Sequence, residues 1–172
     1  MKKFDLKAIA CVSIMIALAV VLKTFGFMIG TNMRISFYAI PLLVAGIIGG
    51  FSWGLVASLA ADLIYGLFFN SYGFNPVYTI SALLWGFSGG LLKQYIKSYG
   101  KLSWFFLGFI VLTASVLETC NNAIWDFALY GRGVTEMLMG YKFIVIGIKL
   151  PILISVSKLI NDRVLKVLFV KE

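Results

Sequence analysis

The sequence has 172 residues, 61% of them hydrophobic and only 13% charged, with a mean hydropathy of +0.98. These values exclude an ordinary soluble domain and predict an integral membrane protein. The formal net charge of +8 does not indicate nucleic acid, because excess Lys and Arg in a membrane protein usually lie in its cytoplasmic loops. Histidine is absent, and Cys11 and Cys120 both lie in apolar runs. That leaves no zinc-ligand spacing and no disulfide framework, so we expect no metal and no cofactor.

The chain begins with a basic start and an apolar run that is too long for a signal peptide and lacks a small-x-small cleavage site. We therefore expect a retained first span. A span takes about 20 mostly apolar residues, and later runs are separated by breaks rich in Gly, Asn, Ser or Pro. The sequence predicts an all-α membrane protein, one compact domain (1–172) of about six transmembrane helices at roughly 5–28, 35–51, 53–69, 78–97, 103–130 and 139–161.

The distribution of basic residues predicts the orientation of these helices. A cytoplasmic N-terminus places most lysines and arginines on the inside, as the positive-inside rule requires. Both termini are then cytoplasmic, and the loops containing Arg34, residues 70–76 and Arg132 lie outside. This arrangement predicts a pocket that opens outward.

The fifth predicted helix carries a polar stripe within an apolar segment. Glu118, Asn122 and Asp126 recur at i, i+4 and i+8, with Asn121 and Trp125 one step away. A charged side chain at membrane depth costs about 2.5–3.5 kcal/mol on insertion scales. Hydrogen bonding between helices is one explanation for the stripe. Two acids and two amides beside a Trp favour the other explanation, a ligand-binding wall.

Aromatic residues mark the start of the fourth predicted helix, FNPVYTISALLWG at 74–86. Asn75 precedes Pro76, which is placed as an early helical residue, and Tyr78 and Trp85 follow at helical spacing. Their rings could stack on a flat heterocycle. Ordinary packing and an interfacial tyrosine belt explain them equally well.

Two cations on the expected outer side are suited to a ligand carboxylate or phosphate. Arg34 stands just before the second span, with Ser36 and Tyr38 close behind it, and Lys142 begins the sixth. Anchoring a helix end to lipid headgroups is the alternative for each cation, and the neighbouring polar residues favour a binding role for Arg34.

Asp62 lies well inside the third span and needs a partner there. Lys23 or Lys149 could serve, which would make Asp62 structural; otherwise it touches the ligand. In the first span, Ser13 and Ala17 form a small-x-x-x-small pair that lets another helix approach closely, which could provide a docking groove for a partner subunit.

The sequence shows no nucleophile paired with a base and no GxxxxGK phosphate loop. We therefore expect no enzymatic activity, and in particular no ATP hydrolysis by this chain. If the protein drives uptake, another subunit supplies the energy. A secondary transporter would normally show two inverted halves, and no internal repeat is evident.

The order of these motifs resembles the substrate-binding S components of energy-coupling factor (ECF) vitamin transporters, in particular the folate-type family. The resemblance covers nearly the whole chain: the small pair Ser13 and Ala17, RISFYAIPLLVAGIIGGFSWGLVASLAADLIYG at 34–66, FNPVYTISALLWGFSGGLL at 74–92, and NNAIWDFALYGRG followed by KFIVIGIKLPI within 121–152. It implies a bundle of about six helices in the bacterial plasma membrane that captures a vitamin from outside. It also implies docking on a transmembrane scaffold subunit that carries two cytoplasmic ATPases.

The chain departs from the family pattern in ways that bear on the vitamin. The family has a sequence closer to Asn-Thr-x-Trp-Leu on the fifth helix, whereas this chain adds Asp126 after the Trp and Glu118 before the amides. Two acids fit a pteridine ring with several N–H donors. Arg34 and Lys142, with Arg132 as a further candidate, could hold a glutamate tail, so folate ranks first. A smaller aminated vitamin, of the pyridoxal or aminopyrimidine type, would use the same acids without the cations. A structural membrane protein with no ligand is the remaining alternative.

Overall fold

The computed structural model describes residues 6–29, 33–70, 73–99, 102–130 and 141–165. Within these ranges the expected all-α membrane bundle is confirmed, with a short antiparallel hairpin in addition. Three of the helices are long and apolar enough to cross a membrane, namely Leu6–Thr24, Phe51–Phe68 and Trp104–Leu129. The elements in chain order are α1 (Leu6–Thr24), β1 (Phe27–Ile29), β2 (Met33–Ile35), α2 (Ala39–Gly49), α3 (Phe51–Phe68), α4 (Pro76–Tyr99), α5 (Trp104–Tyr130) and α7 (Tyr141–Leu159), which continues into a π-helical turn, η1 (Ile160–Leu165).

The hairpin corrects the expected limits of the first two helices. The first helix ends at Thr24 rather than at residue 28, and the second begins at Ala39 rather than at residue 35. Pro41 explains the late start, because a proline is tolerated in the first turn of a helix but breaks its interior. With 11 residues, α2 is about 16 Å long. It therefore covers about half of a 30 Å hydrocarbon core.

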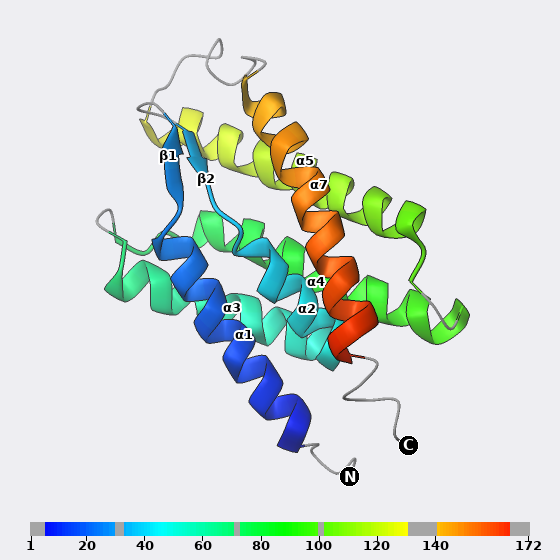
Figure 1. Ribbon diagram of the computed structural model, residues 1–172. Coiled ribbons are helices and arrows are strands. Elements are labelled where there is room, and N and C mark those ends of the chain that lie inside the picture. The colour runs from blue at the N-terminus through cyan, green and yellow to red at the C-terminus, as the bar shows by residue number, and fades with distance from the viewer. Residues whose placement is uncertain (1–5, 30–32, 71–72, 100–101, 131–140, 166–172) are drawn as a thin grey trace.

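The helices alternate in direction along the bundle (Figure 1). The start of α1 and the end of α7 lie at one end, which we call the terminal end. The hairpin, the end of α5 and the start of α7 lie at the other, which we call the hairpin end. The two ends of the described chain are thus on the same side, as the sequence predicts. Large apolar side chains such as Phe105 (85% exposed) and Phe68 (76%) face outward, as a lipid-facing surface requires.

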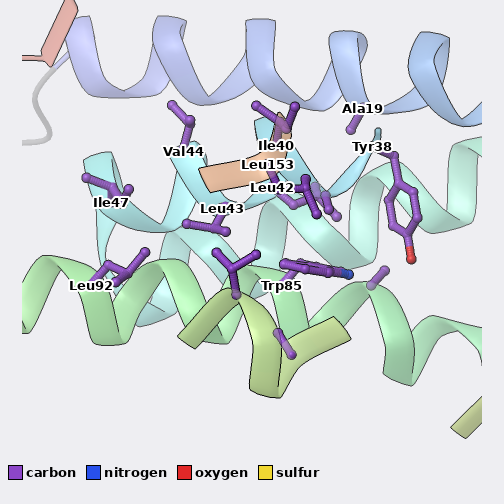
Figure 2. Close-up of a cluster of buried hydrophobic side chains, with 14 of the residues drawn as sticks. Ala19, Tyr38, Ile40, Leu42, Leu43, Val44, Ile47, Trp85, Leu92 and Leu153 are labelled. Atoms are coloured by element: carbon purple, nitrogen blue, oxygen red, sulfur yellow. The ribbon is translucent and has the colours of Figure 1, made fainter. Parts of the chain in front are cut away.

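Helix α4 packs against α2 and α3 through glycines, with almost no side chain between the backbones. A Cβ added to Gly86 would lie 2.2 Å from the carbonyl oxygen of Gly54, and one added to Gly89 would lie 2.2 Å from that of Leu43. Small residues allow this close approach between membrane helices. Beside Gly86, the ring of Trp85 is fully buried in the hydrophobic core, where Figure 2 shows it under Leu42.

We expect Gly86→Ala to destabilise the bundle by about 1–3 kcal/mol, the usual cost of overpacking a tight core. The added methyl group would lie 2.2 Å from the carbonyl oxygen of Gly54 and 2.6 Å from its carbonyl carbon, and because both of these atoms belong to the backbone, rotation of a side chain cannot relieve the clash. Thermal unfolding of the detergent-solubilised protein measures the effect. Gly108→Ala is the control, because its Cβ would meet only Ile154 Cδ1, at 3.5 Å. Equal melting temperatures for the two variants would contradict the proposed tight packing.

Candidate functional site

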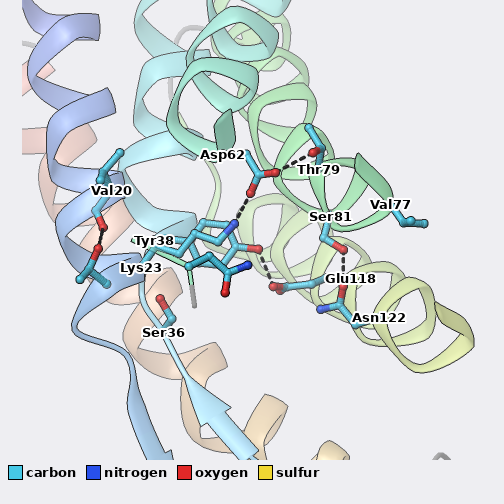
Figure 3. A network of polar contacts seen from close by, with 12 residues as sticks. Val20, Lys23, Ser36, Tyr38, Asp62, Val77, Thr79, Ser81, Glu118 and Asn122 are labelled. Carbon is cyan, nitrogen blue, oxygen red and sulfur yellow. Dashed lines mark hydrogen bonds and ion pairs between the residues drawn. The ribbon is translucent and has the colours of Figure 1, made fainter. Parts of the chain in front are cut away.

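A buried carboxylate, that of Glu118 on α5, is the first centre of a polar network inside the bundle (Figure 3). The Tyr38 hydroxyl donates to its Oε1 at 2.7 Å, and the Trp85 indole donates to its Oε2 at 3.1 Å. The ammonium of Lys149, on α7, lies 3.8 Å from the same Oε2. One carboxylate therefore joins α4, α5, α7 and the residue that precedes α2. Of the predicted ligand-binding residues, Tyr38, Trp85 and Glu118 are brought together here, with the Trp85 ring 0% exposed.

Asp62, on α3, is the second centre. Its Oδ1 forms an ion pair with Lys23 of α1, and its Oδ2 accepts a hydrogen bond from the Thr79 hydroxyl at 2.6 Å. The Lys23 ammonium also lies over the rings of Tyr38 and Tyr65, 4.9 and 4.8 Å from their centroids. Of the two partners expected for Asp62, the structure thus shows Lys23. Tyr38 links the two centres, since its ring faces Lys23 and its hydroxyl binds Glu118 (Figure 3).

The rest of the predicted stripe faces α4. Ser81 Oγ donates to Asn122 Oδ1 at 2.7 Å, and Asn121 Nδ2 donates to Ser81 Oγ at 3.0 Å and to the Val77 carbonyl at 3.1 Å. These amides are half-buried. Among the described residues, the Nδ2 group of Asn122 makes no hydrogen bond. This amide group can therefore still donate a hydrogen bond to an acceptor on a ligand.

Near the hairpin end, Tyr78 and Asp126 form a further pair, with the Tyr78 hydroxyl donating to Asp126 Oδ1 at 2.6 Å. Trp125, beside Asp126, is half-buried. Asn75 has a local role at the start of α4, where its side-chain oxygen accepts a hydrogen bond from the Val77 amide at 3.2 Å. An Asn at this position is a typical helix N-cap.

The predicted cations and docking residues lie elsewhere. The side chains of Arg34 and Lys142, and the whole of Arg132, are outside the residues that the structure describes, so their roles stay predictions. Ser13 and Ala17 are exposed on the outer face of α1, where another helix could reach them.

Sequence reasoning missed several members of the network. Thr79 and Tyr65 carry no distinctive pattern. The sequence predicts Lys149 only as an alternative partner for Asp62, although a lysine in mid-helix is itself a signal of a buried acid. In the described ranges no group of three His, Cys, Asp or Glu side chains could hold a metal ion. The contacts that the network shows are hydrogen bonds and ion pairs.

Comparison with known proteins identifies the fold. No protein-family model matches the sequence, and no curated protein sequence matches it. Among solved structures, the chain is similar to the crystal structure of FolT bound with folic acid, with a TM-score of 0.78 and 26% sequence identity over 94% of this chain and 96% of that chain. The likeness to folate-type S components expected from the sequence is thereby confirmed, and the chain has the fold of FolT.

We expect Lys23→Met to destabilise the protein by about 3–5 kcal/mol, because it leaves the buried Asp62 carboxylate without its cation. The double variant Lys23→Met/Asp62→Asn should recover much of this loss, since it removes both charges. Thermal unfolding in detergent measures both effects, with the exposed Lys97→Met of α4 as the control. A double variant no more stable than the single one would show that the pair is not energetically coupled.

Proposed function

We propose that this protein is the substrate-binding S component of an ECF-type importer in the bacterial plasma membrane, and that its ligand is folate. The observation that carries the proposal is the similarity to folic-acid-bound FolT, which extends over 94% of this chain. In this role the chain binds the vitamin from outside but does no chemistry on it. ATP is hydrolysed by two partner subunits, and a transmembrane scaffold subunit connects them to this chain.

The polar residues of α4 and α5 match the chemistry of a pterin ring. The ring presents several N–H donors together with carbonyl and ring-nitrogen acceptors. Asp126 and the amide oxygens of Asn121 and Asn122 can accept from such donors, and their half-buried positions combine access with partial exclusion of water. Tyr78 and Trp125 supply aromatic surface beside them. We assign the glutamate tail to Arg34, Lys142 and Arg132.

One observation favours the alternative of a bundle without a ligand. Ser81 with Asn122, and Tyr78 with Asp126, are bonded across the α4–α5 interface, as expected if the stripe only joins helices. A smaller aminated vitamin, such as a pyridoxal-type compound or an aminopyrimidine, would use the same residues. Mass spectrometry of the molecule that co-purifies with the detergent-solubilised protein separates the three cases. Folate bound in stoichiometric amount supports the proposal, and a different bound vitamin would identify that compound as the ligand instead. A protein that is purified empty and binds no member of a vitamin panel refutes the proposal.

We expect Asp126→Asn and Asn122→Ala each to weaken folate binding by about 1–3 kcal/mol, the cost of removing a buried hydrogen-bonding partner. Equilibrium titration of folic acid against the purified variants measures the change, and thermal unfolding without ligand verifies that the bundle remains folded. Ser98→Ala, on the exposed terminal part of α4, is the control. Wild-type affinity in both site variants would exclude the stripe from the binding site.

The exposed small residues of α1 give the proposal a second test. Ser13→Trp or Ala17→Trp should leave folic-acid binding unchanged and reduce uptake into cells to near background, because the bulky ring prevents close approach of the scaffold helix. Val56→Trp, at a lipid-facing position of α3 (53% exposed), should alter neither property. Normal uptake by both α1 variants would exclude this face as the docking surface.

A further inference from the structure

Lys149 holds its ammonium next to a carboxylate that already has close donors. The Glu118 carboxylate accepts hydrogen bonds from the Tyr38 hydroxyl at 2.7 Å and from the Trp85 indole at 3.1 Å. The Lys149 ammonium lies 3.8 Å from the nearer carboxylate oxygen, which is beyond hydrogen-bond distance. Glu118 is the one polar partner that Lys149 has among the described residues. An ammonium has three N–H donors, so this one retains donors for a further acceptor.

Three other lysines, Lys23, Lys93 and Lys158, are held differently. Lys23 is paired with Asp62 and lies between two tyrosine rings. Lys158 donates to the Leu102 carbonyl and pairs with Asp162 at 3.2 Å, and Lys93 donates to the Ile48 carbonyl at 2.5 Å. Each of these three has a hydrogen-bonded oxygen partner. Lys149, whose side chain is only 11% exposed, lacks one within the described ranges.

The charge around Lys149 restricts what the additional acceptor can be. The two centres contain two lysines, Lys23 and Lys149, and two acids, Asp62 and Glu118, so their formal charges cancel. A ligand carboxylate arriving here would add a negative charge with no cation left to balance it, and burying such a charge is costly. A neutral carbonyl oxygen or ring nitrogen would add no charge and would therefore avoid this cost.

The backbone beside Lys149 also departs from a regular helix. Pro151 lies inside α7, and because proline has no N–H, the carbonyl of Gly147 loses its normal helical donor. A Cβ added to Gly147 would meet no atom within 4 Å. Membrane helices tolerate such breaks where another group satisfies the freed backbone. Gly147 is exposed whereas Lys149 is half-buried, so the open space lies on a different face of α7 from Lys149. The proline contributes only a freed backbone carbonyl two residues before Lys149.

We propose that Lys149 is a specificity-determining residue that donates a hydrogen bond to the carbonyl oxygen of the bound heterocycle, and so selects 4-oxo pterins over their 4-amino analogues. This inference rests on the proposed function. In folic acid the 4-oxo group is an acceptor that an ammonium can bind. In aminopterin, the 4-amino analogue, an N–H donor replaces it and faces the ammonium with like polarity.

Titration of the purified protein with folic acid and with aminopterin tests the inference. We expect the wild type to prefer folic acid by roughly tenfold or more, since a site built around a hydrogen bond rejects the analogue that cannot form it. Lys149→Met should bind folic acid about 10- to 100-fold more weakly and lose the preference. Lys149→Gln, which retains a neutral donor toward Glu118 and should fold if the Met variant does not, should also lose most of the preference, because its amide can turn to accept from the 4-amino group.

Lys158→Met is the matched control, since it replaces a lysine of the same helix whose side chain is equally exposed (11%) but lies at the terminal end. It should retain the wild-type preference even if it melts earlier. A Lys149 variant that weakens both ligands equally and keeps the preference would overturn the inference and leave the proposed function standing. A wild-type protein that binds neither ligand would overturn the proposed function, and the inference with it.

Discussion

The direct contact between the backbones of α2, α3 and α4 is the constraint on which the rest of the structure depends. Gly46, Gly54, Gly86 and Gly89 place no side chain of their own in the crossing, and a methyl group at any of them would lie within 2.5 Å of a main-chain atom. This approach fixes the depth of Trp85 and therefore the position of its indole N–H. Glu118 accepts from that N–H, so the location of the deepest acid on α5 follows from glycines on other helices.

The charges of the two centres are compatible with the membrane because each acid has a basic partner on another helix. Asp62 is neutralised by Lys23, and Glu118 by Lys149 with two neutral donors. Tyr38 contacts both centres, and it directly precedes α2 at the end of the short segment, residues 36–38, that follows the hairpin. The Ser36 hydroxyl connects that segment to α1 by donating a hydrogen bond to the Leu22 carbonyl at 2.8 Å. A displacement of the hairpin would consequently move Tyr38, and with it the hydrogen bond to Glu118 and the contact with Lys23.

The sequence predicts helices where apolar runs are long, and it identifies the polar stripe of α5 because the i, i+4, i+8 spacing is a local property. It fails where the outcome depends on contacts between distant segments. Three-residue strands are too short to leave a periodic signal, although Pro41 could have indicated the late start of α2. Asp62 clearly needed a cation, but the sequence could not choose between Lys23 and Lys149, which lie 39 and 87 residues away along the chain. The fold places Lys23 beside Asp62 and Lys149 beside Glu118. The bonding of Glu118 to Tyr38 spans 80 residues, and no pattern within one helix encodes it.

The stripe that looks uniform in sequence has two parts with different chemistry. At its deep end, Glu118 is 7% exposed and both of its oxygens accept from protein donors, so its first effect is to hold helices together. Toward the hairpin end, Asn122 and Asp126 are half-buried, and each is bonded to a side chain of α4 that water or a ligand could replace at small cost. Recognition is therefore expected from the shallow part, supported by a deep part whose geometry is already fixed. Lys149 lies at the boundary, because it is tied to the deep carboxylate by charge while its N–H donors remain available to a ligand.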